Sequence, residues 1–111
     1  MGVVTEDFGK GQPDKIRAII AGRAKGVDYV YAHPEEAADI TAKAYNMDAA
    51  LVRTVFQHFK AMQWWGRGDL HYKAMDRMVE GMQVVGKLSG GVDWSKIVDT
   101  SFLPKELQPK S

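Results

Sequence analysis

Hydrophobic residues recur at steps of three and four along most of the chain, which is the spacing of one face of an α-helix. The first such segment predicts a long helix over residues 14–32, begun by the turn residues Pro13 and Asp14. A strand pattern is limited to Val3-Val4-Thr5. The expected buried face of the first helix carries Ile16, Ile19, Ile20, Ala24, Val27, Val30 and Tyr31.

Local capping residues predict where the next two helices begin and end. Pro34 disfavours helical dihedral angles at His33 and suits the first position of a second helix over 34–45, for which His33 is the expected polar cap. Asn46 suits a left-handed helix end, and Asp48 can cap a third helix. The expected buried stripe of that third helix is Val52, Val55, Phe56, Phe59 and Met62.

The glycines of the 66–68 segment are expected to end the third helix, and Asp69 to cap a fourth. Gly86 marks the end of this fourth helix. In the C-terminal segment, Asp93 is the expected cap of a short helical piece and Ser101 that of a last turn. The expected apolar face of the fourth helix is Met75, Met78, Val79, Met82 and Val85.

Together these elements predict an all-α fold of four main helices, short C-terminal turns and one short N-terminal strand at most. A chain of 111 residues is long enough for one core, so we expect a single helical domain over residues 1–111. Trp94 and Phe102 are expected to anchor the C-terminal segment to the helices. The predicted divisions are an extended arm at 1–12, helices at 13–88, and turns and tail at 89–111.

Composition mainly excludes classes of function. A net charge of +1 gives no field that would attract nucleic acid or an anionic membrane. No apolar run approaches the length of a membrane span, and the N-terminus lacks the layout of a signal peptide. We therefore expect no nucleic-acid partner, no membrane insertion, and a cytoplasmic location if 111 residues is the native length.

Candidate catalytic and metal chemistry is sparse. The histidines His33, His58 and His71 form no pair spaced by four residues, and the absence of cysteine excludes a Cys-ligated metal. Ser101, His71 and Asp99 could be assembled into a triad on paper, but no nucleophile motif surrounds the serine. The expectation is a non-enzymatic protein without a metal or cofactor.

The segment 93–107, DWSKIVDTSFLPKEL, has a Trp, Asp-Thr-Ser and Leu-Pro spacing that resembles the closing segment of periplasmic solute-binding proteins. The resembled group is the nitrate, sulfonate, taurine and thiamine-precursor type of ABC-transporter binding protein. Residues 3–8 and 12–14 are similar to the strand, loop and helix start that open the last third of such proteins. His33-Pro34-Glu35-Glu36-Ala37-Ala38 resembles the helix break that follows.

This resemblance implies a fold and a function. The chain would correspond to the helical C-terminal part of a two-lobed α/β protein, which is periplasmic and delivers a small anion or organic solute to a membrane permease. Thr5, Glu6 and Asp7 would lie at the edge of the ligand cleft. Because ligand groups converge from both lobes, we expect this chain to be unable to bind the solute alone.

The alternative is a free-standing helical interaction or regulatory domain that self-associates. Val3 and Val4 would offer an unpaired strand edge to a second copy. Trp64 and Trp65 cannot point the same way, so one is expected in the core and the other at an interface. Both interpretations predict a homo-oligomer when the chain is isolated, because an apolar face is left without a cover.

Overall fold

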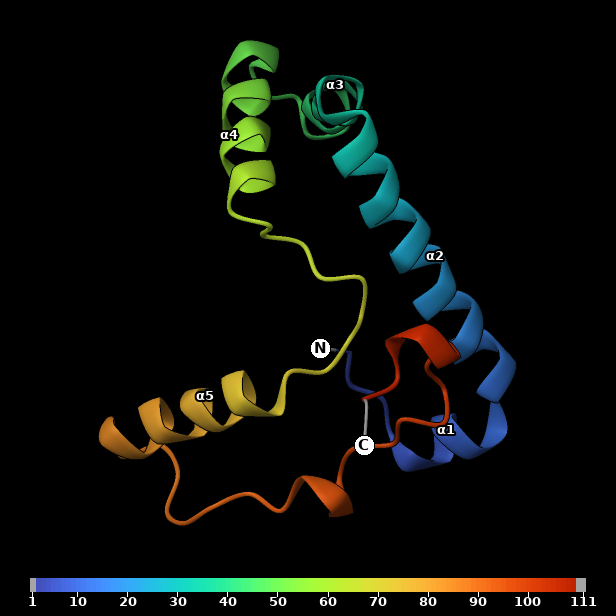
Figure 1. Ribbon diagram of the computed structural model, residues 1–111, viewed down its shortest axis with the longest axis vertical. Helices are drawn as coiled ribbons and strands as arrows, with labels where there is room; N and C mark the ends of the chain where they lie inside the picture. The colour runs from blue at the N-terminus through green and yellow to red at the C-terminus, as the bar shows by residue number, and fades with distance from the viewer. Residues whose placement is uncertain (1, 110–111) are drawn as a thin grey trace.

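The computed structural model describes residues 2–109, and these residues form helices and loops with no strand (Figure 1). The predicted all-α class is confirmed. The α-helices are α1 (Glu6–Gly11), α2 (Pro13–Ala32), α3 (Pro34–Tyr45), α4 (Ala49–Ala61) and α5 (Tyr72–Val84). Two 3₁₀ turns follow, η1 (Trp94–Lys96) and η2 (Lys105–Leu107).

The predicted limits of the middle helices are confirmed where a local cap sets them. Helix α3 begins at Pro34, and Asn46 closes it in the left-handed conformation with φ of 52°. The Asp48 carboxylate accepts a hydrogen bond from the backbone N–H of Leu51 at 2.8 Å and so begins α4. His33 occupies the position before α3, but its side chain makes no capping hydrogen bond and its ring lies against Tyr29 instead.

The N-terminal prediction is wrong over the described residues. Val3 and Val4 are exposed and belong to no strand, and the rest of the expected extended arm contains the short helix α1. The Thr5 hydroxyl accepts a hydrogen bond from the backbone N–H of Phe8 at 3.2 Å and caps this helix. Two acidic residues in the first turn and a Glu6–Lys10 ion pair favour it further.

The predicted boundaries between the third and fourth helices are also wrong. Helix α4 ends at Ala61, because Gln63 adopts a left-handed conformation with φ of 51° well before the glycines. Helix α5 begins at Tyr72, and the Asp69 carboxylate pairs with the His71 side chain rather than capping the helix. Ser101 likewise does not cap η2, whose first flanking residue is Pro104.

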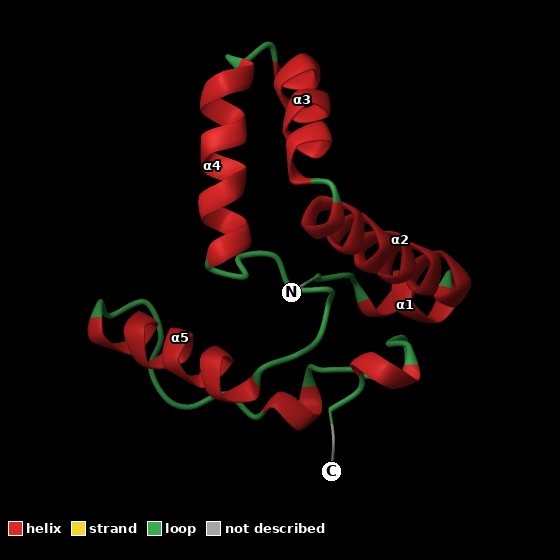
Figure 2. Ribbon diagram, turned by 45° about the horizontal axis from the view of Figure 1, so that its top comes forward, coloured by secondary structure: helices red, strands yellow, loops and turns green. Residues whose placement is uncertain are grey.

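Helices α3 and α4 form an antiparallel hairpin with the best-packed core of the molecule (Figure 2). Ala38 is fully buried, and Ala42 and Val52 are nearly so. Small alanine side chains allow the two helix axes to approach closely. The Arg53 guanidinium donates two hydrogen bonds of 2.7 Å to the two oxygens of the Asp39 carboxylate, which joins the helices at their surface.

The loop over residues 62–71 runs back along α2 and is held there by polar contacts. The Tyr31 hydroxyl accepts from the backbone N–H of Trp65 at 2.8 Å and donates to its carbonyl at 2.9 Å. Arg67 forms an ion pair with Asp28, with Nε 2.9 Å from Oδ1. Arg23 donates to the Gly66 carbonyl. These contacts hold residues 65–67 against α2, ahead of the start of α5 at Tyr72.

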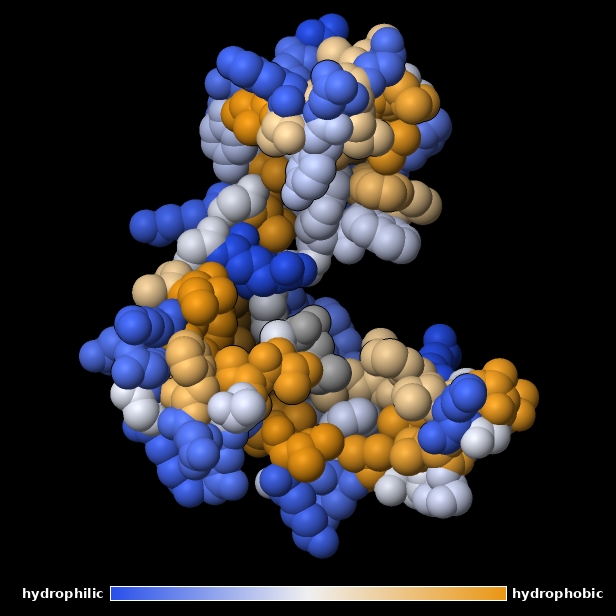
Figure 3. Space-filling model, turned by 180° about the vertical axis from the view of Figure 1, so that it is seen from behind, coloured by the Kyte–Doolittle hydropathy of each residue, from blue (hydrophilic) through white to orange (hydrophobic). Residues whose placement is uncertain are grey.

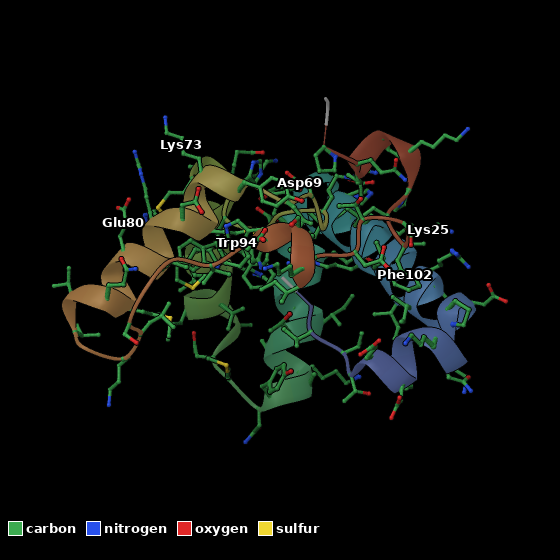
Figure 4. All side chains as sticks on the ribbon, turned by 90° about the horizontal axis from the view of Figure 1, so that it is seen from below. Lys25, Asp69, Lys73, Glu80, Trp94 and Phe102 are labelled. Carbon is green, nitrogen blue, oxygen red and sulfur yellow. The ribbon has the colours of Figure 1, made fainter. Side chains whose placement is uncertain are left out.

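The C-terminal segment returns to α2, as Figure 4 shows for Phe102 beside that helix. Asp93 caps η1 as predicted, by accepting from the backbone N–H of Ser95. The Trp94 indole donates to the Asp76 carboxylate of α5 at 2.6 Å, so this residue does anchor the segment. Phe102 is only half-buried, under the Arg17 guanidinium. The buried anchors are Leu103 and Leu107, which pack against Ala24.

The molecule is open rather than compact. Its radius of gyration is 16.9 Å, whereas about 13 Å is typical of a domain of this length. Its accessible surface of 8595 Å² exceeds by about 2,500 Å² the area expected for a monomer of this mass. No large side chain among the described residues is fully buried. The helices therefore leave apolar surface that they do not cover themselves.

Candidate functional site

The residues predicted at the edge of a ligand cleft form the cap and the first turn of α1. Thr5, Glu6 and Asp7 are all exposed, at the cap and first turn of a six-residue helix. The Thr5 hydroxyl is used by the cap and Glu6 pairs with Lys10. No strand precedes them in the described residues, so the strand-end geometry on which their cleft role depends is absent from residues 2–109.

The two adjacent tryptophans take different environments, as their sequence position predicts. Trp65 is half-buried, and its ring meets the edges or faces of Tyr31, Phe56 and Phe59 at centroid distances of 5.1 to 5.8 Å. Trp64 stacks on the outer side of the same Phe59 ring at 5.0 Å and remains 63% exposed. Trp65 thus belongs to a small aromatic core, whereas Trp64 projects a large apolar ring into solvent.

Half of the residues in the apolar stripes predicted for the third and fourth helices are exposed. Val52 is the buried residue of α4, and Met75 is the buried residue of α5. Figure 3 shows hydrophobic residues gathered along the lower part of the molecule, which includes α5, with a hollow between this part and the α3–α4 hairpin. We call the exposed apolar residues that follow α4, Met62 and Trp64, and those on and just after α5, Met78, Met82 and Val85, the α4–α5 surface.

A depression of about 220 Å³ lies at the start of α5, within this surface. We call it the α5 pocket. Its lining is mostly apolar, with the Asp69–His71 side-chain contact at one side. Cavities of roughly 150 Å³ hold one benzene molecule, so the α5 pocket has room for a single large side chain. It is lined by Asp69, Leu70, His71, Ala74, Met75 and Met78.

Sequence reasoning missed this pocket, although the pattern contained a signal for it. Ala74, Met78 and Met82 are spaced by four residues on α5, which places them in one row along the helix, and Leu70 lies in the loop before it. The prediction treated Met78 and Met82 as core and left Leu70 and Ala74 out. Ala74 and Met78 of this row line the depression, together with Leu70.

A second, shallower depression of about 490 Å³ lies at the α2–α3 break, beside His33, Glu36 and Asp39. A hydrogen bond to the Glu36 carboxylate raises the pKa of the Tyr29 hydroxyl. The Arg53 guanidinium, by its hydrogen bonds, lowers the pKa of Asp39. Both shifts come from local pairs at the surface and do not organise an acid and a base around a common point.

The residues of the triad considered from sequence have other partners. His71 pairs with Asp69, and hydrogen bonds from the Ser101 side chain and backbone lower the pKa of Asp99. Within residues 2–109 no three His, Asp or Glu side chains are grouped in a way that could hold a metal ion. The most distinctive exposed feature of the described residues is therefore the apolar α4–α5 surface.

Comparisons of the chain with protein-family models, with curated proteins and with solved structures found no match. Among the described residues, none of the helices combines the length and the apolar character needed to cross a membrane.

Proposed function

We propose that this chain is the helical C-terminal part of the solute-binding component of an ABC importer, with no enzymatic activity of its own. The observation that carries the proposal is the DWSKIVDTSFLPKEL segment at 93–107, whose pattern resembles the end of such proteins and whose residues tie the C-terminus to two helices. The α4–α5 surface would then be covered by the α/β lobes of the same protein.

The residues that carry the resemblance each have a structural role that would preserve the pattern. Trp94 donates its indole N–H to Asp76 of α5. Asp99 accepts from the backbone N–H of Ser101 at 2.9 Å and turns the chain. Leu103 is buried against α2, and Pro104 starts the last turn. A segment of this pattern is therefore suited to connect the last helix, α5, back to α2.

In this proposal, the α/β lobes of the longer protein determine which solute is bound. The ligand would be nitrate, a sulfonate, a thiamine precursor or a related small solute, delivered to a membrane permease from the periplasm. Affinity in a two-lobed binder comes from groups that converge on the solute and from closure around it. The chain by itself is therefore expected to bind none of these solutes.

The test compares two proteins by isothermal calorimetry. The first is the 111-residue chain, and the second is the same chain lengthened through the reading frame upstream of the Met1 codon. We expect the longer protein to bind nitrate, taurine or a thiamine precursor and the shorter one to bind none. Micromolar binding by the shorter chain, or an upstream frame that encodes no α/β lobes, would contradict the proposal.

The second candidate is a free-standing helical interaction domain that self-associates. The observation in its favour is that the chain carries both an exposed indole, Trp64, and an apolar pocket that could receive one. The strand edge expected at Val3 and Val4 gives no support, because these residues form no strand. The upstream reading frame separates the two candidates.

A further inference from the structure

The accessible surface that the chain leaves uncovered is large compared with an ordinary protein interface. A standard protein interface buries about 800 Å² on each side, and homodimer interfaces are often larger. The accessible surface of this chain exceeds the compact expectation by about 2,500 Å². An interface of ordinary size would cover about a third of this excess, and a large homodimer interface would cover most of it.

The same chain supplies both halves of a knob-and-pocket contact. Trp64 is held from behind by stacking on Phe59, so its exposed ring is presented in a fixed orientation. The α5 pocket begins at Asp69, on the loop that leads from Trp64 to α5. Buried tryptophans in fitted pockets are the residues that contribute most to interface affinity.

In a two-fold dimer, the contact between a Trp64 ring and an α5 pocket would occur twice. In such an interface, if residue i of one copy contacts residue j of the other, then j also contacts i across the axis. We propose that the isolated chain forms a homodimer across the α4–α5 surface, in which Trp64 of each copy enters the α5 pocket of the other.

Charge does not oppose this association. The net charge of the chain is +1, so two copies repel each other only weakly. Lys73 and Glu80 of α5 point outward from the helix, as Figure 4 shows, and alternate with Asp76 and Arg77 in the sequence. This mixture of signs along α5 lets opposite charges face each other at the rim of an antiparallel contact.

The first experiment measures self-association by sedimentation equilibrium for the unaltered chain and two variants. Trp64→Ala removes the knob, and Met78→Glu places a charge at the pocket. Each change affects both symmetric contacts, and one anchor residue changes the dissociation constant by about 30-fold, so each variant should weaken the dimer by about 1,000-fold. Tyr45→Ala, which truncates an even more exposed ring at the end of α3, should leave the constant unchanged.

The second experiment mixes the two weakened variants. A mixed dimer retains one intact contact, because Trp64 of the Met78→Glu copy meets the unaltered pocket of the Trp64→Ala copy. The mixture should therefore dimerise about 30-fold more tightly than either variant alone. Circular dichroism of each variant confirms that the helices are retained.

Three results would overturn the inference. The unaltered chain sedimenting only at 12.4 kDa would show that a second copy does not cover the surface. A dimer that both variants leave unchanged would place the contact elsewhere. A mixture no tighter than its components would exclude the reciprocal arrangement. The dimer of the isolated chain does not depend on solute binding by a longer protein, so the two proposals fail separately.

Discussion

Helices α4 and α5 have the same length of 13 residues and similar apolar stripes, yet they reach different environments. Helix α4 follows α3 across a turn of three residues and packs on it around Ala38, Ala42 and Val52. Helix α5 follows a longer loop, packs extensively on no other helix of the described chain, and buries Met75 alone. An apolar stripe thus predicts that a helix has a face to bury but does not supply the surface that covers it.

The difference also separates two kinds of stability. Opening the hairpin exposes a packed core and breaks the Asp39–Arg53 contact between its helices. Detaching α5 exposes little apolar surface. This helix is held by the two hydrogen bonds between the Tyr31 hydroxyl and the Trp65 backbone, which we call the loop clasp, and by the Trp94–Asp76 hydrogen bond. The hairpin is therefore expected to keep its structure by itself, whereas α5 gains most from a covering partner.

The same substitution placed in the two helices gives the largest expected contrast. Val52→Asp puts an unpaired charge at a position that is 4% exposed, which should cost roughly 3 to 5 kcal/mol of unfolding free energy. Val84→Asp changes a position on α5 that is 88% exposed, and should cost less than about 1 kcal/mol. Urea unfolding of the two variants measures both. Equal losses would mean that α5 is as well packed as the hairpin.

Truncating each C-terminal anchor to alanine should lower the unfolding free energy more for the more buried side chain. Leu103→Ala removes a side chain buried against α2 and should cost about 2 to 5 kcal/mol. Phe102→Ala removes a half-buried ring and should cost about half of the 3 to 5 kcal/mol typical of a core phenylalanine. Thermal unfolding compares them. A larger loss for Phe102 than for Leu103 would mean that burial does not rank the anchors.

The loop clasp is tested by removing one oxygen atom. Tyr31→Phe leaves the backbone N–H and carbonyl of Trp65 without their partner, which should cost about 1 to 3 kcal/mol. Tyr45→Phe is the matched control, because the Tyr45 ring is largely exposed at the end of α3. The measurement is urea unfolding followed by tryptophan fluorescence. If both variants unfold alike, the clasp does not hold the loop.

Acid should weaken the α3–α4 hairpin slightly. Hydrogen bonds from Arg53 lower the pKa of Asp39 below its usual 3.8, so the folded state favours the charged carboxylate. The stabilisation is present above that usual value and is lost as the pH falls through the lowered pKa. The effect is small because both side chains are nearly half exposed. Nuclear magnetic resonance titration of the α3 and α4 amides follows it, and Asp39→Asn should abolish it.

The sequence by itself determined the elements whose causes are local. Pro34 set the break between α2 and α3, because a proline constrains the residue before it and has no N–H to lose at a helix start. Asn46, Asp48 and Asp93 acted as predicted, because a cap needs only the backbone groups within a few residues. The division of the two tryptophans also followed from their adjacency.

Only the tertiary structure decided which apolar faces became core. The Asp69 carboxylate contacts His71 instead of capping α5, and α1 formed within the arm that was expected to be extended. Burial of Val52 and exposure of Met78 and Met82 depend on which helix lies opposite, and that is set by contacts between distant residues such as Tyr31 and Trp65. The α5 pocket arose in the same way, because a row spaced by four residues becomes a depression only where no other helix fills it.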